Sequence, residues 1–370
     1  MGWAKFAIMV VTAGAAALLP ACSRAPQSTD TVFVSDEAGG VTLLDGATGR
    51  IEGHLATGPR PRGMAFSPDG KIFYVAASKA DRIEAWDVRT RRLVKTYGSG
   101  TDPERFAISP DGRTAFIASE DHSAVTFLDL KTGRITREVK VGPEPEGVGV
   151  SPDGRLVVAT SETANLAHFI DAASGKLLDS LPVGSRPRFV LFLNGGRTVW
   201  VSSEQRGTIS EFDTATRKLV RTIDLTEAFD IPEPVMAIEM RATKDESRVY
   251  VAMGRANRVA ELDPIGGKVL RWWPTGERTW GIGLSPDETR LYAAAGIGGT
   301  LTIIDLKAGK VIHTVKLGGR PWGAIAASKS DRYFISVPST AKRWVQPTSM
   351  PRVASSPLRW VAMASASAGW

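Results

Sequence analysis

Residues 58–87 read GPRPRGMAFSPDGKIFYVAASKADRIEAWD, and this stretch decides the fold. It holds a Gly-x-x-Pro step, a Ser-Pro-Asp-Gly turn, a β-branched and aromatic run, and a hydrophobic residue followed by aspartate. The pattern recurs along the chain with a spacing of 42 residues, except for one interval of 50, and its aspartates are Asp45, Asp87, Asp129, Asp171, Asp213, Asp263 and Asp305. Seven copies of a unit of this length are typical of a repeat architecture.

The turns and runs within each unit indicate four short strands. Copies of the Ser67 to Gly70 turn begin at Ser109, Ser151 and Ser285, and proline and glycine supply the backbone angles that such turns need. Between the turns lie runs such as Ile72-Phe73-Tyr74-Val75, which favour strands. We therefore predict an all-β fold, a seven-bladed β-propeller of four-stranded blades that occupies residues 31–328.

The two ends of this domain are expected to pair. The first unit begins directly with Val32-Phe33-Val34, so its blade lacks an innermost strand. Trp322 to Ala326 has the pattern of an innermost strand but is not followed by a blade of its own. The C-terminal inner strand is therefore predicted to close the ring by pairing with the first blade.

Composition agrees with a globular domain and disfavours nucleic acid as a partner. The 370 residues are 43% hydrophobic, and 37 glycines and 22 prolines are spread at intervals. The net charge of +7 comes from the ends, because two of the 46 bases precede residue 30, and six bases but only one of the 39 acids follow residue 328. The remaining 38 bases and 38 acids balance, so the domain lacks the broad basic surface of a nucleic-acid binder.

The first 21 residues have the pattern of an export signal, with Lys5 before an apolar run from Phe6 to Leu19. Leu19-Pro20-Ala21-Cys22 is similar to a bacterial lipobox, in which the cysteine becomes a lipid anchor. Cys22 is the only cysteine, so it cannot form an internal disulfide. Two interpretations stay open: lipidation of Cys22, or ordinary cleavage that releases a soluble protein. Both predict a periplasmic location, with residues 22–30 as a linker.

Residues 329–370 are predicted to be a disordered basic tail, rich in serine, alanine, proline and arginine. Two alternatives stay open for this segment. It could be a basic arm for an acidic partner, or it could derive from an altered reading frame.

The repeats resemble the YVTN-type β-propeller family in two places: Tyr250-Val251-Ala252, followed by Val259 to Asp263, and Gly318 to Gly323. More narrowly, Val32 to Gly40 and Gly254 to Val259 are similar to exported seven-repeat propellers associated with PQQ-dependent alcohol catabolism. This resemblance implies a non-enzymatic protein that works beside a periplasmic quinoprotein dehydrogenase or a transporter component. It supplies no catalytic residues, and a monomer without a cofactor is expected.

Two rings of repeat-phase residues are predicted on one face of the propeller. The residue after each repeat proline, or its equivalent, gives the inner ring: Arg62, Glu104, Glu146, Arg188, Trp280 and Trp322. The residue nine positions before each repeat aspartate gives the second ring: Asp36, Ser78, Glu120, Glu162, Glu204, Gly254 and Gly296. Together they place acids with Arg188 on one side and tryptophans beside bare glycine loops on the other.

Three interpretations of this face stay open. Its acids and tryptophans could hold a planar or cationic ligand by stacking and charge pairing. The face could instead dock a protein partner, since tryptophan and arginine are common anchors. Alternatively, the acids only cap loops and pair with Arg62 and Arg188 while the tryptophans plug the channel. On the opposite face a series of basic turns, from Arg50 to Lys310, is predicted to be solvated, with a basic rim for phosphates as the alternative.

The sequence carries no recognisable catalytic or metal motif. His54, His122, His168 and His313 are scattered over different units without metal-ligand spacing. Glu120, Glu162 and Glu204 could offer oxygen ligands to Ca²⁺, but they lie on three blades and are expected to be too far apart for one ion. We expect a binding protein and no enzyme. A metal-assisted, lactonase-like hydrolase at the channel mouth is the first alternative, and single-stranded nucleic-acid binding is the second.

Overall fold

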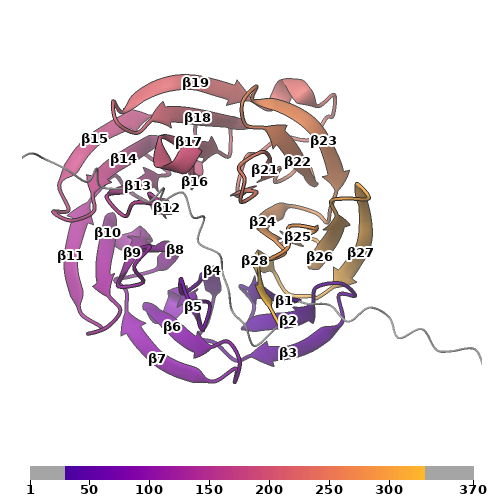
Figure 1. Cartoon of the computed structure of the whole chain (residues 1–370), viewed down its shortest axis with the longest axis horizontal. Coiled ribbons are helices and arrows are strands. Elements are labelled where there is room, and N and C mark those ends of the chain that lie inside the picture. The colour runs from indigo at the N-terminus through magenta and orange to yellow at the C-terminus, as the bar shows by residue number, and fades with distance from the viewer. Residues whose placement is uncertain (1–29, 330–370) are drawn as a thin grey trace, which may run out of the picture. The chain divides into compact units, whose positions relative to one another are not determined.

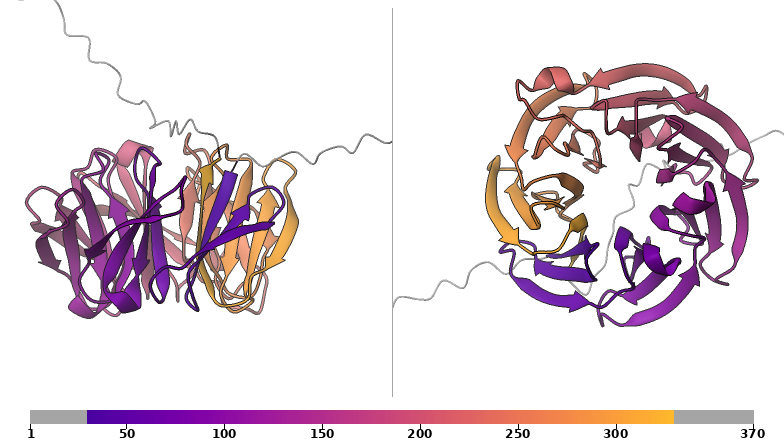
Figure 2. Two further views of the ribbon diagram at one scale, coloured as in Figure 1. Left: turned by 90° about the horizontal axis from the view of Figure 1, so that it is seen from below. Right: turned by 180° about the vertical axis from the view of Figure 1, so that it is seen from behind.

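The structure, a computed structural model, describes residues 30–329. Over this range the chain forms seven four-stranded antiparallel sheets, which stand around a common axis as the blades of a propeller (Figure 1). Side and rear views show the blades as upright sheets arranged in a ring (Figure 2). The predicted seven-bladed fold is therefore confirmed.

Blade 1 combines strands from both ends of the described chain: β28 (Pro321–Ser328), β1 (Asp30–Asp36), β2 (Val41–Asp45) and β3 (Ile51–Leu55). Each other blade takes four successive strands, with the first innermost. Blade 2 contains β4 (Pro61–Phe66), β5 (Ile72–Ala77), β6 (Arg82–Asp87) and β7 (Leu93–Gly98). Blade 3 contains β8 (Pro103–Ile108), β9 (Thr114–Ser119), β10 (Ala124–Asp129) and β11 (Ile135–Lys140). Blade 4 contains β12 (Pro145–Val150), β13 (Leu156–Ser161), β14 (Leu166–Asp171) and β15 (Leu177–Pro182).

The remaining blades follow the same order. Blade 5 contains β16 (Pro187–Leu193), β17 (Thr198–Ser203), β18 (Thr208–Asp213) and β19 (Lys218–Asp224). Blade 6 contains β20 (Met240–Ala242), β21 (Val249–Ala252), β22 (Arg258–Asp263) and β23 (Lys268–Pro274). Blade 7 contains β24 (Thr279–Leu284), β25 (Arg290–Ala295), β26 (Thr300–Asp305) and β27 (Lys310–Lys316). Short 3₁₀ turns occur at η1 (Ser78–Ala80), η2 (Glu120–His122), η3 (Asn194–Gly196) and η4 (Thr226–Ala228).

The repeated Ser-Pro-Asp-Gly turns join the inner strand of a blade to the second strand. In blade 2, the Ser67 hydroxyl donates to Asp69 Oδ1 at 2.6 Å and accepts from the backbone N–H of Ile72 at 3.0 Å. Gly70 adopts φ 71°, a left-handed conformation that favours glycine. The turn residues thus satisfy backbone groups where the chain reverses.

The ring closes as predicted, through β28 and β1. These strands pair antiparallel, with Val34 opposite Ala324 and Ser35 opposite Gly323. Ser35 Oγ accepts from the Gly323 N–H at 3.2 Å. The two ends of the domain are therefore held by a complete strand ladder.

An insertion interrupts the repeat before blade 6 and accounts for the 50-residue interval. The chain passes through η4 and then buries Phe229, whose ring lies 6.3 Å from that of Trp272 on β23. The register of β20 against β21 places Ile238 where the other blades carry the residue after the repeat proline. The sixth position of the inner ring is therefore apolar.

His168 is buried inside blade 4 among small polar groups. Its Nε2 accepts from the Gly142 N–H at 3.2 Å and lies 2.8 Å from Ser161 Oγ, while Nδ1 lies 2.8 Å from Ser180 Oγ. Since Nε2 accepts a backbone hydrogen bond, the neutral ring carries its proton on Nδ1. Burial lowers the pKa of His168 to about 4.

This lowered pKa predicts a loss of stability in mild acid. Between about pH 6.5 and pH 4 the unfolded chain binds a proton at His168 that the folded protein does not, so the free energy of unfolding falls as the pH falls, by up to about 3 kcal/mol. Glu162, whose pKa burial raises to about 7, titrates in the same window with the opposite sign. Urea unfolding of the wild type and of His168→Gln across this range isolates the histidine, and parallel curves for the two proteins would refute the prediction.

The predictions for the ends of the chain lie almost entirely outside the described residues. These are the export signal, lipidation at Cys22, the linker and the tail, of which the structure describes only Asp30 and Lys329. Lys329 Nζ contacts Asp45 Oδ2 at 2.6 Å and Glu52 Oε1 at 2.9 Å. Within residues 30–329, no helix has the length and apolarity needed to cross a membrane.

Candidate functional site

One face of the ring, here called the mouth face, carries the loops that precede the inner strands and the loops that join the second and third strands. Because the inner strands all begin at this face, the repeat phase brings their first residues together around the channel. The two predicted rings of residues therefore belong to the same face. The structure adds the contacts between them.

The acids and arginines of the mouth face are paired with one another. Arg62 on β4 contacts Glu104 on β8 and donates from Nη2 to Glu37 Oε1 at 2.8 Å. Burial lowers the pKa of Arg62 and the neighbouring glutamates raise it, with a net upward direction. The side chain of Glu104 is completely buried, whereas that of Glu37 retains 18% of its exposure.

Arg188 on β16 is the centre of a second buried network. Its guanidinium contacts Glu146, lies 2.7 Å from Glu162 Oε2 through Nη1, and lies 2.6 Å from Glu204 Oε2 through Nε. Burial opposes the charge of Arg188, but the three glutamates outweigh it and raise the pKa. Four predicted site residues are thus brought together, in the pairing that the third interpretation of this face expected.

Three further arginines, which the repeat pattern alone did not mark as site residues, cover these acids. Arg60, Arg186 and Arg278 each stand immediately before an inner strand, and all have positive φ, between 53° and 56°. Arg60 Nη1 lies 2.9 Å from Asp102 Oδ1, and Arg278 Nη2 lies 3.3 Å from Glu204 Oε1. The sequence shows that these arginines occupy the same repeat position. It does not show that their side chains contact the acids of the mouth face.

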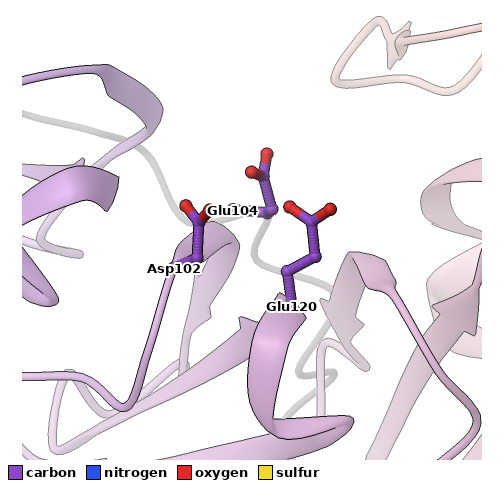
Figure 3. A group of neighbouring side chains, drawn as sticks. All are labelled: Asp102, Glu104 and Glu120. Atoms are coloured by element: carbon purple, nitrogen blue, oxygen red, sulfur yellow. The ribbon is translucent and has the colours of Figure 1, made fainter.

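Asp102, Glu104 and Glu120 form an acidic cluster on blade 3 (Figure 3). One carboxylate oxygen from each of the three residues lies within 4.8 Å of those of the other two. Asp102 is already held by Arg60 and by Lys79, whose Nζ lies 3.2 Å away. Burial, followed by the nearby carboxylates, raises the pKa of Glu104 well above its ordinary value. Arg60 and Arg62 already pair with Glu104, so the cluster does not by itself indicate a metal site.

The three loop acids considered as calcium ligands are divided between these groups. Glu120 lies with Asp102 and Glu104, whereas Glu162 and Glu204 both contact Arg188. The three loop acids therefore belong to two separate groups of contacts. Asp36 has a different environment, since its Oδ1 accepts from the backbone N–H groups of Ala38 at 2.8 Å and Arg320 at 2.7 Å. Its carboxylate therefore holds the β1–β2 loop against β28.

An ion pair crosses the channel below the mouth. Arg105 on β8 reaches from blade 3 to blade 6, where Nη2 lies 3.0 Å from Glu239 Oε2. The Arg105 guanidinium also lies 4.9 Å from the Phe189 ring and 4.3 Å from the Trp322 ring, and Arg241 contacts Glu239 from the same blade. The corresponding positions of four other inner strands are glycines: Gly63, Gly147, Gly281 and Gly323. A Cβ at Gly281 would lie 3.0 Å from Glu239 Oε2.

Each predicted tryptophan is flanked by two arginines. Arg62 lies 5.7 Å and Arg105 4.3 Å from the Trp322 ring centroid. Arg188 lies 5.4 Å and Arg278 4.5 Å from that of Trp280. Trp322 is only 4% exposed, so most of its surface is already covered. The arginines thus occupy the positions that a cationic ligand would take above these rings.

A small pocket nevertheless opens between the two tryptophans. It has a volume of about 110 Å³ and is lined by Glu37, Arg62, Trp280, Gly296, Ile297, Arg320, Pro321 and Trp322. We call it the tryptophan pocket. Gly296 is required beside it, because a Cβ at this position would lie 2.9 Å from Trp280 Cδ1. The glycine loop that the sequence placed next to the tryptophans therefore allows Trp280 to line the pocket.

Comparison with known families gives a partial match. The family described as outer membrane protein assembly factor BamB matches residues 121–273, which is less than half of the chain. None of the curated proteins matches the sequence.

Several solved structures share the fold at low sequence identity. The periplasmic gluconolactonase of Pseudomonas aeruginosa aligns with a TM-score of 0.68 and 21% identity, over 81% of this chain and 99% of that chain. Hydrazine synthase of Kuenenia stuttgartiensis aligns with a TM-score of 0.61 and 18% identity, over 71% of this chain and 88% of the other. A protein of unknown function from Desulfotomaculum acetoxidans aligns with a TM-score of 0.66 and 17% identity, over 81% of this chain and 99% of that chain.

These likenesses concern the fold, and the YVTN type expected from the sequence stays an expectation. The repeat, the seven blades and the partial family match agree that the chain is a repeat-built propeller, without specifying its type. The chain is a seven-bladed β-propeller built from sequence repeats, and the family match over residues 121–273 agrees with this.

Proposed function

We propose that this chain is an exported, non-enzymatic β-propeller that binds a small ligand in the tryptophan pocket. The observation that carries the proposal is the convergence of Arg62, Trp280 and Trp322, three residues of the predicted inner ring, on one pocket. Small-molecule sites are concave, largely apolar, and contain a few placed polar groups. The tryptophan pocket has this composition.

The size of the pocket restricts the ligand to one ring or a group of similar size. Its volume is about 110 Å³. A cavity of about 150 Å³ holds benzene in another protein, so a single ring fills a site of this order. Any larger part of the ligand would project past Ile297, which is 50% exposed.

The cellular setting is part of the proposal and rests on the sequence. The export signal, the resemblance to propellers of PQQ-dependent alcohol catabolism, and the outer-membrane description of the partly matching family all favour the periplasm. A quinoprotein dehydrogenase or a transporter component is the proposed partner. In this setting the pocket binds a small product or substrate of that system, and the protein either delivers the molecule to its partner or senses it.

Thermal unfolding of the full chain tests the pocket. The probes are benzyl alcohol, benzoate, benzamide, pyrroloquinoline quinone, CaCl₂ and a short oligonucleotide. A probe at 100 times its dissociation constant should stabilise the protein by about 2.7 kcal/mol. Trp280→Ala should weaken binding about thirty-fold, as expected for loss of a tryptophan anchor. Trp272→Ala removes a 45% exposed tryptophan from the outermost strand of blade 6 and should leave binding unchanged.

The same experiment separates the competing functions. If only the oligonucleotide raises the unfolding temperature, nucleic-acid binding is favoured. If none of the probes changes the unfolding temperature, protein docking remains as the function of the mouth face. Because the gluconolactonase of P. aeruginosa shares the fold, hydrolysis of glucono-lactone should also be measured. Turnover that depends on added metal and is lost in Glu120→Gln would overturn the non-enzymatic proposal.

A further inference from the structure

Glu37 places a carboxylate of the protein among three arginines at the edge of the tryptophan pocket. Its Oε1 lies 2.8 Å from Arg62 Nη2 and 3.9 Å from Arg60 Nε, and its Oε2 lies 3.8 Å from Arg320 Nε. A guanidinium binds a carboxylate of the protein and a carboxylate of a ligand with the same geometry. The three arginines therefore form a receptor for one carboxylate, which Glu37 fills.

Glu37 differs from the other carboxylate that Arg62 binds. Glu104 is fully buried beneath the mouth, and its Oε1 also lies 3.6 Å from Arg60 Nη2, so it is held between two arginines and has no route to water. Glu37 retains 18% of its side-chain exposure and can turn toward solvent, and Arg62 keeps Glu104 as its partner when it does. Among the residues that line the tryptophan pocket, Glu37 is the one with a carboxylate.

The surroundings of Glu37 permit this exchange without movement of the strands. The backbone on either side is fixed, because Asp36 caps the loop and the Glu37 N–H donates to the Arg320 carbonyl at 3.1 Å. Only side-chain torsions need to change. Arg320, with a side chain 70% exposed, has its guanidinium available to a group that arrives from solvent.

We propose that Glu37 is an internal competitor at a carboxylate subsite, and that the tryptophan pocket takes a small aromatic carboxylate whose carboxylate replaces that of Glu37 on Arg62 and Arg320. This inference rests on the proposed function and names its ligand class. The exchange conserves charge, since one carboxylate leaves the arginines as another arrives. Glu37 thereby weakens the apparent affinity for the ligand, because the receptor is free only for the fraction of time that Glu37 is turned away.

Isothermal titration of the full chain with benzoate, benzamide and benzyl alcohol tests this role. Glu37→Gln should bind benzoate at least ten-fold more tightly than the wild type, because the amide competes less well for arginine, and should bind benzamide with unchanged affinity. Arg320→Met should weaken benzoate binding about ten-fold and leave benzamide unaffected. Glu144→Gln, which changes an exposed glutamate on the mouth face of blade 4, is the matched control and should behave as the wild type.

The outcomes distinguish this inference from the proposed function. If benzyl alcohol and benzamide bind in a manner that depends on Trp280, but Glu37→Gln does not improve benzoate binding, the competitor role is wrong and the pocket stands. Should Glu37→Gln fold poorly, Arg320→Met tests the carboxylate subsite independently, and unchanged benzoate binding in that variant would overturn it. If no probe binds any of the variants, both the pocket and the competitor are refuted.

Discussion

Ending the chain at Gly319 is expected to abolish cooperative folding, although it removes only ten of the described residues. The truncation deletes β28, the inner strand that pairs with β1 from Asp30 to Asp36 and closes the ring. Val32, Phe33 and Val34 on β1 are at most 2% exposed and would face water. Exposing three such side chains costs more than about 5 kcal/mol, which is comparable to the total stability of many domains.

Circular dichroism during urea unfolding, with limited proteolysis, measures this effect. A second truncation after Lys329 is the matched control, because it removes the tail and leaves β28 whole. That protein should unfold at the same urea concentration as the full chain. A cooperative transition of native steepness in the chain that ends at Gly319 would show that the ring does not need its closing strand.

Replacing Arg188 by methionine is expected to destabilise the protein by about 3 to 5 kcal/mol, the usual cost of removing one partner from a buried ion pair. Arg188 is 5% exposed and is the shared partner of Glu146, Glu162 and Glu204. Without it, buried carboxylates on blades 4 and 5 repel one another in a site with little water. They must then bind protons or draw water into the channel.

Urea unfolding at pH 7 measures the loss, and the chain offers a matched control. Arg186 contacts Glu162 and Glu204 as Arg188 does, but 36% of its side chain is exposed. Arg186→Met should therefore cost less than about 1 kcal/mol, as is usual for partly solvated pairs. Equal losses for the two variants would contradict the view that burial makes Arg188 the centre of the network.

A rescue experiment checks the physical reason. Adding Glu204→Gln to Arg188→Met removes one of the uncompensated charges and should recover part of the lost stability. If the double variant is less stable than Arg188→Met, packing of the arginine stem is the larger contribution and the electrostatic argument is wrong.

The periodicity of the sequence was sufficient for the fold, because a propeller is built from local hairpins whose signals repeat. Ser67 to Gly70 and its copies mark reversals that depend on a few adjacent residues. The pairing that closes the ring could also be predicted from the sequence. The first unit lacks an inner strand and the last inner strand lacks a blade, so a closed ring requires the two to pair. The same phase placed Arg62, Trp280 and Trp322 on one face, where the structure gathers them around one pocket.

The partners of each charge were decided only by the tertiary structure. Periodicity states which blade and face a residue occupies, but not where a long side chain ends. Arg105 crosses the channel to Glu239, and Glu37 reaches Arg62 between blades, at sequence separations that no local pattern records. Burial then sets the strength of these contacts, because a carboxylate interacts more strongly with arginine where water is excluded. Arg62 contacts two carboxylates, and that of Glu104 is fully buried whereas that of Glu37 is 18% exposed.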